Sequence, residues 1–74
     1  MTPTIPTEQE IHTALARDTF YGHHPERVVV PAGYTGAAHV DGVPVEIEED
    51  ADVPYVVPLD GGRLGFDGLE LSTR

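Results

Sequence analysis

The sequence predicts a mainly β protein with one N-terminal helix, built as an antiparallel meander of five or six short strands. Three Asp-Gly pairs flanked by apolar residues occur within 28 residues, at Asp41-Gly42, Asp60-Gly61 and Asp67-Gly68. Asp-Gly is typical of two-residue hairpin turns, because a type I′ turn needs positive φ at both central positions. A helix-start pattern precedes all three turns. A chain of 74 residues is sufficient for a single domain only.

The helix is expected over residues 8–20. Thr7 has the side chain of an N-cap residue, and Glu10 three residues later completes a capping box. Gly22 supplies the positive φ of a C-terminal stop. The expected apolar stripe consists of Ile11, Ala14, Leu15 and Tyr21, interrupted by Asp18. The chain then divides into an extended lead-in at residues 1–6, a helix segment at 7–22, a connector at 23–26 and the β-meander at 27–72.

The turns also predict which residues pair across each hairpin. A strand from Arg27 to Val30, ended by Pro31, opens the meander. The first turn gives the pairs Val40 with Val43, Ala38 with Val45 and Gly36 with Ile47. The second gives Val57 with Leu64 and Tyr55 with Phe66, and the third gives Phe66 with Leu69 and Leu64 with Leu71. The three turns are expected to agree on one apolar face, which comprises Val53, Tyr55, Val57, Leu59, Leu64, Phe66, Leu69 and Leu71.

Residues 27–71 resemble an SH3-like barrel of the KOW or Tudor kind. The run RVVVPAGYTG at residues 27–36 is similar to the opening strand and glycine-containing loop of such domains, and PYVVPLDGG at residues 54–62 is similar to their later strand and tight turn. The resemblance implies a small closed barrel that binds peptides, nucleic acid or neighbouring proteins and has no catalytic residues. It also implies that Tyr34 lies in the recognition loop. A plain antiparallel meander capped by the helix is the alternative fold.

Charge narrows the classes of partner. Thirteen acidic residues stand against four arginines, with a formal net charge of −9 and no lysine. Binding to nucleic acid or to an anionic membrane depends on cationic groups, so both are disfavoured, and the basic residues of KOW domains are missing here. A protein partner with a basic surface is the expectation. The absence of lysine and asparagine suggests a GC-rich coding source, such as a high-GC bacterium or its bacteriophage.

The expected location is the cytoplasm. The chain has no cysteine, which leaves no disulfide and no sign of an oxidising compartment. No run of about 18 apolar residues is present, and residues 1–6 lack the pattern of a secretion signal.

The densest charge lies at residues 46–52, which hold five acids in seven positions. Such a run is typical of a solvated loop, and its clustering makes it a candidate recognition patch. This run lacks the residue spacing of a calcium-binding loop. The predicted partner-binding residues are Tyr34, Glu46, Glu48, Glu49, Asp50 and Asp52.

Metal binding and catalysis are not predicted. Four histidines are present, but His23 and His24 are adjacent and point apart in an extended chain, and no two histidines have the i, i+4 spacing of helical zinc ligands. We therefore expect no metal and no cofactor. Without cysteine or lysine, and with Ser72 near the end of the chain, few nucleophiles are available, so no enzyme activity is expected.

Three functions follow from these patterns. The first is a small non-enzymatic interaction module that binds a protein partner through an acidic and aromatic surface. The second is a phage-encoded inhibitor that imitates DNA phosphates with carboxylates. The third is a homo-oligomeric virion or shell component, joined through an open sheet edge at Val28–Val30 or Val53–Leu59.

Overall fold

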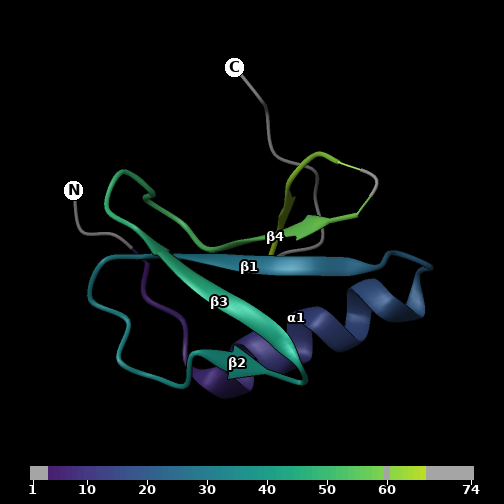
Figure 1. Cartoon of the computed structure of the whole chain (residues 1–74), viewed down its shortest axis with the longest axis horizontal. Helices are drawn as coiled ribbons and strands as arrows, with labels where there is room; N and C mark the ends of the chain where they lie inside the picture. Colours follow the sequence, from purple (N-terminus) through teal and green to yellow (C-terminus); the bar gives the residue numbers. More distant parts are fainter. Residues whose placement is uncertain (1–3, 60, 67–74) are drawn as a thin grey trace.

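The computed structural model describes residues 4–59 and 61–66, which form one helix and a five-stranded open sheet (Figure 1). The elements are α1 (Glu8–Phe20), β1 (Pro25–Pro31), β2 (His39–Val40), β3 (Val43–Glu48), β4 (Tyr55–Pro58) and β5 (Leu64–Gly65). The strand order is β2-β3-β1-β4-β5. The predicted class, mainly β with one N-terminal helix, is confirmed for these residues.

The start and end of α1 follow the sequence prediction. Thr7 donates its backbone N–H to Oε1 of Glu10 at 2.9 Å, and Glu10 donates its own to Oγ1 of Thr7 at 3.2 Å, which completes the capping box. Gly22 follows the helix with a φ of 91°. The prediction that Tyr21 lies on the buried stripe is wrong: its side chain is 70% exposed, because the chain has already left the helix. Asp18 is the fourth buried residue of the stripe instead.

The core lies between α1 and one face of the sheet. Ile11, Ala14 and Leu15 of the helix pack against valines of β1 and β4 and against Leu64 of β5. Burial of each of these larger side chains stabilises the fold by about 1.5–3 kcal/mol relative to exposure. The helix is therefore held as a layer on the sheet.

β1 is the central strand, and this position corrects two predictions. It pairs with β4 in antiparallel fashion but with β3 in parallel, with Val28 opposite both Val45 and Val56. The purely antiparallel meander is thus wrong: the segment 32–38 carries the chain across before the β2–β3 hairpin, so β3 runs in the same direction as β1. A central strand has no free edge, so the proposed oligomer seam at Val28–Val30 is wrong as well. The strand also begins at Pro25, earlier than expected.

The SH3-like barrel is not confirmed, because the described sheet is open. β2 and β5 stand at opposite ends of the strand order and do not pair. The coarse architecture is therefore a mixed open sheet with one helix on it.

The first predicted hairpin is confirmed. Val40 pairs with Val43, and the turn residues Asp41 and Gly42 have φ angles of 53° and 80°. The backbone N–H of Val45 donates to Ala38 at 2.7 Å. Strand pairing does not continue as far as Gly36 and Ile47, and the Ile47 side chain is 56% exposed.

The second predicted hairpin is shifted by one residue. Val56, rather than Val57, lies opposite Leu64, and Tyr55 lies opposite Gly65 rather than Phe66. A shift of one residue moves side chains to the other face. Val56 is therefore in the core, whereas Val53 and Leu59 of the predicted apolar face are exposed. The third turn, Asp67-Gly68, and the pairs that involve Leu69 and Leu71 lie outside the described residues.

Candidate partner-binding site

Five exposed carboxylates gather at the end of β3 and in the segment that leads to β4. We call Glu46, Glu48, Glu49, Asp50 and Asp52 the acidic end. Because β1 and β3 are parallel, both strands finish near this end, and the loop between β3 and β4 projects from it (Figure 1). The structure thus brings together the five acidic residues that the sequence singles out.

Backbone hydrogen bonds fix the loop that carries the acids. Ala51 donates its N–H to the carbonyl of Glu48 at 3.2 Å and closes a tight turn with Glu49 and Asp50 at its tip. Thr4 donates its N–H to the carbonyl of Asp52 at 2.9 Å, which ties the lead-in to the loop. The carboxylates at the tip are therefore presented from an ordered backbone, which lowers the entropy lost on binding.

Glu46 and Glu48 belong to the face of the sheet that α1 does not cover. Residues paired directly across strands project from the same face, and Glu46 lies opposite Val29, which lies opposite Tyr55. Val29 and Tyr55 are buried, yet they are not part of the core beneath the helix. The uncovered face thus has a small apolar centre of its own, with charged side chains around it.

Polar contacts connect this small centre to the acids. Nε of Arg27 lies 3.6 Å from Oε1 of Glu46, and the Tyr55 hydroxyl donates to Oε2 of Glu48 at 3.3 Å. The guanidinium of Arg63 lies 5.0 Å from the centre of the Tyr55 ring, within the range of a cation–π contact. Burial, followed by the charge of Glu48, raises the pKa of Tyr55, so this hydroxyl remains a hydrogen-bond donor.

Four acids of the acidic end, Glu48, Glu49, Asp50 and Asp52, have no salt bridge to a described cation. Arg27 pairs with Glu46, and Glu48 accepts its hydrogen bond from the neutral Tyr55 hydroxyl. The negative field of these four acids is therefore uncompensated locally and would attract a cationic group. No group of three or more potential metal ligands occurs among residues 4–59 and 61–66.

Tyr34, the sixth predicted binding residue, is placed in the core. Its ring packs with the helix-side cluster, and its hydroxyl donates to the carbonyl of Ala37 at 2.9 Å. Burial, with a smaller contribution from the charge of Glu8, raises the pKa of this hydroxyl. A packing role explains its position, and its part in binding stays a prediction.

Sequence reasoning missed the contacts of Tyr55 and Arg63 at the site and of Arg17 in its scaffold. Tyr55 was assigned to the apolar face, but it contacts both Glu48 and Arg63. Arg17 donates to the carbonyls of Phe66 at 2.7 Å and Gly65 at 3.3 Å, so it joins α1 to β5. No local pattern signals such contacts, since the bonded residues are 48 and 49 positions apart.

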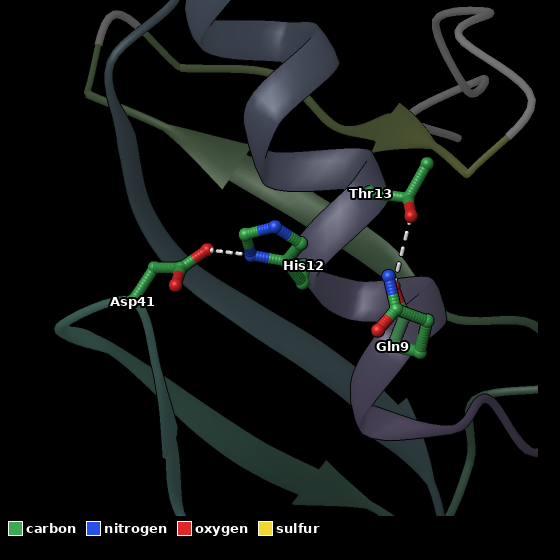
Figure 2. A network of polar contacts seen from close by, with 4 residues as sticks. All are labelled: Gln9, His12, Thr13 and Asp41. Atoms are coloured by element: carbon green, nitrogen blue, oxygen red, sulfur yellow. Dashed lines mark hydrogen bonds and ion pairs between the residues drawn. The ribbon is translucent and has the colours of Figure 1, made fainter.

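The histidines are dispersed over the molecule. Nδ1 of His12 lies 2.5 Å from Oδ2 of Asp41, which joins α1 to the β2–β3 turn (Figure 2). His23 and His24 are in the connector after the helix, and His39 is an exposed residue of β2.

Comparisons with protein-family models, with curated proteins and with solved structures found no match. Among the described residues, no helix has the length and apolar character needed to cross a membrane.

Proposed function

We propose that the protein is a small, non-enzymatic, cytoplasmic interaction module that binds a basic protein partner through its acidic end. The observation that supports this most is the ordered turn with Glu49 and Asp50 at its tip, where neither carboxylate has a salt bridge to a described cation. The proposal requires no closed barrel. The SH3-like resemblance would add only that related small β-domains bind peptides or proteins.

The form of the site predicts how binding responds to salt. The acids are exposed, and interactions between exposed charges are screened over about 8 Å at physiological ionic strength. Complementary charges act mainly by steering encounter and by selecting partners. Binding through the acidic end should therefore weaken as salt rises and as carboxylates are neutralised.

The test is capture of a partner from a high-GC bacterial lysate by the immobilised full chain, followed by measurement of affinity with the purified partner. The double variant Glu49→Gln/Asp50→Asn should lose about tenfold or more in affinity, which corresponds to about 1.4 kcal/mol.

A matched control removes the same number of charges elsewhere. Glu8→Gln/Glu26→Gln also changes the net charge by two units, at exposed positions outside the acidic end. We expect this control to retain most of the affinity. Equal losses in both double variants would show that only net charge matters and would reject the acidic end as a site.

A further inference from the structure

The edge of β3 that faces away from β1 is only partly covered by β2. Two residue pairs join these strands, so β2 lies beside the first part of β3 only (Figure 1). The last bond of the hairpin runs from the N–H of Val45 to the carbonyl of Ala38 at 2.7 Å. Beyond Val45, β3 continues to Glu48, and no strand of the described chain lies against this edge over residues 46–48.

The main chain of Ile47 points towards this open edge. Successive residues of a strand direct their N–H and C=O groups to opposite edges. Because Val45 bonds to the β2 side, Ile47 points to the same side, whereas Glu46 and Glu48 point towards β1. No hydrogen bond joins the N–H or the carbonyl of Ile47 to a residue within 4–59 or 61–66.

The edge is open because the preceding loop is held elsewhere. The Tyr34 hydroxyl donates to the carbonyl of Ala37 at 2.9 Å, and the Tyr34 ring packs in the core beneath α1. The chain before Ala38 is therefore bonded to the core cluster rather than to β3. The Ile47 side chain is 56% exposed, so the position is accessible. An accessible N–H and C=O pair on a strand edge is a template for an additional strand.

The side chains along this edge alternate in chemistry. Ile47 lies opposite the core residue Val30 on the helix side, whereas Glu46 and Glu48 belong to the face that α1 does not cover. In an added strand, the residue opposite Ile47 would share its face, and the residues before and after it would share the face of the two glutamates. Apolar contact favours an apolar residue at the first position, and opposite charge favours basic residues at the other two.

The two glutamates can each accept a further cation. Among the described residues, Arg27 contacts Oε1 of Glu46, and Tyr55 donates to Oε2 of Glu48. Each carboxylate therefore keeps a second oxygen for an incoming side chain.

We propose that the basic partner of the acidic end binds as an extended segment, which adds a strand antiparallel to β3 and carries a basic–apolar–basic sequence across Glu46–Glu48. This inference rests on the proposed function and adds the conformation and the residue pattern of the partner. The central residue of the segment would exchange two main-chain hydrogen bonds with Ile47, in line with β2. Main-chain bonds give such complexes affinity, and alternate side chains give specificity. Glu49 and Asp50 at the next turn would steer the segment to the edge.

A short peptide tests the inference by nuclear magnetic resonance of the full ¹⁵N-labelled chain. The acetylated and amidated peptide Arg-Val-Arg-Val-Arg is added up to about 5 mM, because a contact of this size is expected to be weak. It should slow the hydrogen exchange of the Ile47 amide about threefold or more, since a hydrogen-bonded N–H exchanges only when the bond opens. The amide of Glu46 already faces β1 and should change little.

Two control peptides keep the charge of the first. Val-Arg-Arg-Arg-Val has the same composition without the alternation, and Arg-Val-Arg-Val-Arg with both valines N-methylated lacks the donors that would bond to Ile47. Neither should protect the Ile47 amide. Equal protection by the N-methylated peptide would overturn the added strand. If all three peptides shift the amides of Glu49 and Asp50 but leave Ile47 unprotected, the inference fails and the acidic end remains the binding site.

A pair of protein variants gives a second readout. Ile47→Lys places a cation at the apolar position and should weaken binding of the alternating peptide about fivefold or more. Leu59→Lys adds the same charge at an exposed position near His24, at the opposite end of β1, and should bind like the wild type. Equal weakening by both variants would overturn the inference, as would failure of every peptide to protect Ile47. The proposed function is decided separately, by partner capture with Glu49→Gln/Asp50→Asn.

Discussion

The acidic end and the exposed side of α1 differ in how their polar groups are satisfied. At the acidic end, four carboxylates have no salt bridge to a described cation and remain in water. On the exposed side of α1, the side chains of His12 and Thr13 are bonded within the chain. The acidic end is suited to a long-range attraction that salt weakens, whereas the contact of His12 with Asp41 joins α1 to the β2–β3 turn.

The difference lies in what the carboxylates do in each region. Five of the 13 acidic residues lie within residues 46–52, whereas the exposed acids Glu8 and Glu10 stand in the first turn of α1, where they complement the helix dipole. The following predictions test the parts of the fold on which this contrast depends, in order of decreasing effect.

The largest effect should come from the contact that holds α1 on the sheet. The Ile11 side chain is 0% exposed and the Ile47 side chain is 56% exposed, so the same Ile→Ala change compares a buried position with an exposed one. Ile11→Ala should lower the free energy of unfolding by about 2–5 kcal/mol, and Ile47→Ala by no more than about 0.5 kcal/mol. Urea unfolding followed by circular dichroism measures both. Similar losses at the two positions would contradict the placement of the helix.

A smaller effect should separate the two faces of β4. Val56 lies in the core beneath the helix, whereas its neighbour Val57 is only half-buried. Val56→Ala should cost about 2 kcal/mol and Val57→Ala less than about 1 kcal/mol, since fewer contacts are lost. The opposite ranking would support the pairing of Val57 with Leu64. It would also contradict the assignment of residues to the sheet face that α1 does not cover.

The buried carboxylate of Asp18 should produce a pH-dependent effect. Burial raises its pKa above 3.8 despite the opposing influence of Arg17 and His23, and its Oδ2 atom has no partner among the described residues. At pH values between the ordinary pKa of Asp18 in the unfolded state and its higher pKa in the folded state, the folded protein binds more protons than the unfolded one. The free energy of unfolding therefore falls as pH rises through that window. Asp18→Asn should therefore stabilise the protein by about 1 kcal/mol at pH 7.

The stabilisation by Asp18→Asn should shrink as pH is lowered below the ordinary pKa of aspartate, where the wild-type side chain is neutral in both states. Parallel unfolding curves at several pH values measure the difference. A difference that does not vary with pH would rule out ionisation of Asp18 as the cause.

The smallest effect should come from the contact between His12 and Asp41, because both side chains are about half exposed. A double-mutant cycle with His12→Ala and Asp41→Asn should give a coupling of about 0.2–1 kcal/mol. Asparagine tolerates the positive φ of the turn, so the backbone is preserved. Zero coupling would contradict a stabilising contact between these two side chains.

Local patterns predicted the helix and the first hairpin well. The capping box and Gly22 set the helix ends through contacts within a few residues, and Asp41-Gly42 fixes its own register by turn geometry. The second hairpin was misplaced because alternating apolar residues fit two neighbouring registers, and the paired Gly61 and Gly62, with φ of 94° and 88°, permit a longer loop. The parallel pairing of β1 with β3 depends on a crossover that no turn motif encodes.

The candidate site was predicted only in part, for the same reason. A run of acids is visible in the sequence, and the structure keeps those residues together because they are neighbours in the chain. The burial of Tyr34 and the contacts of Tyr55 with Glu48 and Arg63 depend on how distant segments meet.

The most direct test of the acidic end is a salt titration of partner binding by the wild-type protein and by Glu49→Gln/Asp50→Asn, from about 50 to 500 mM NaCl, a range over which the screening length shortens. The affinity of the wild-type protein for the captured basic partner should fall by about tenfold or more, whereas the affinity of the double variant should fall less, because it has fewer charges to screen. An equal response of the two proteins to salt would contradict the assignment of electrostatic binding to the acidic end.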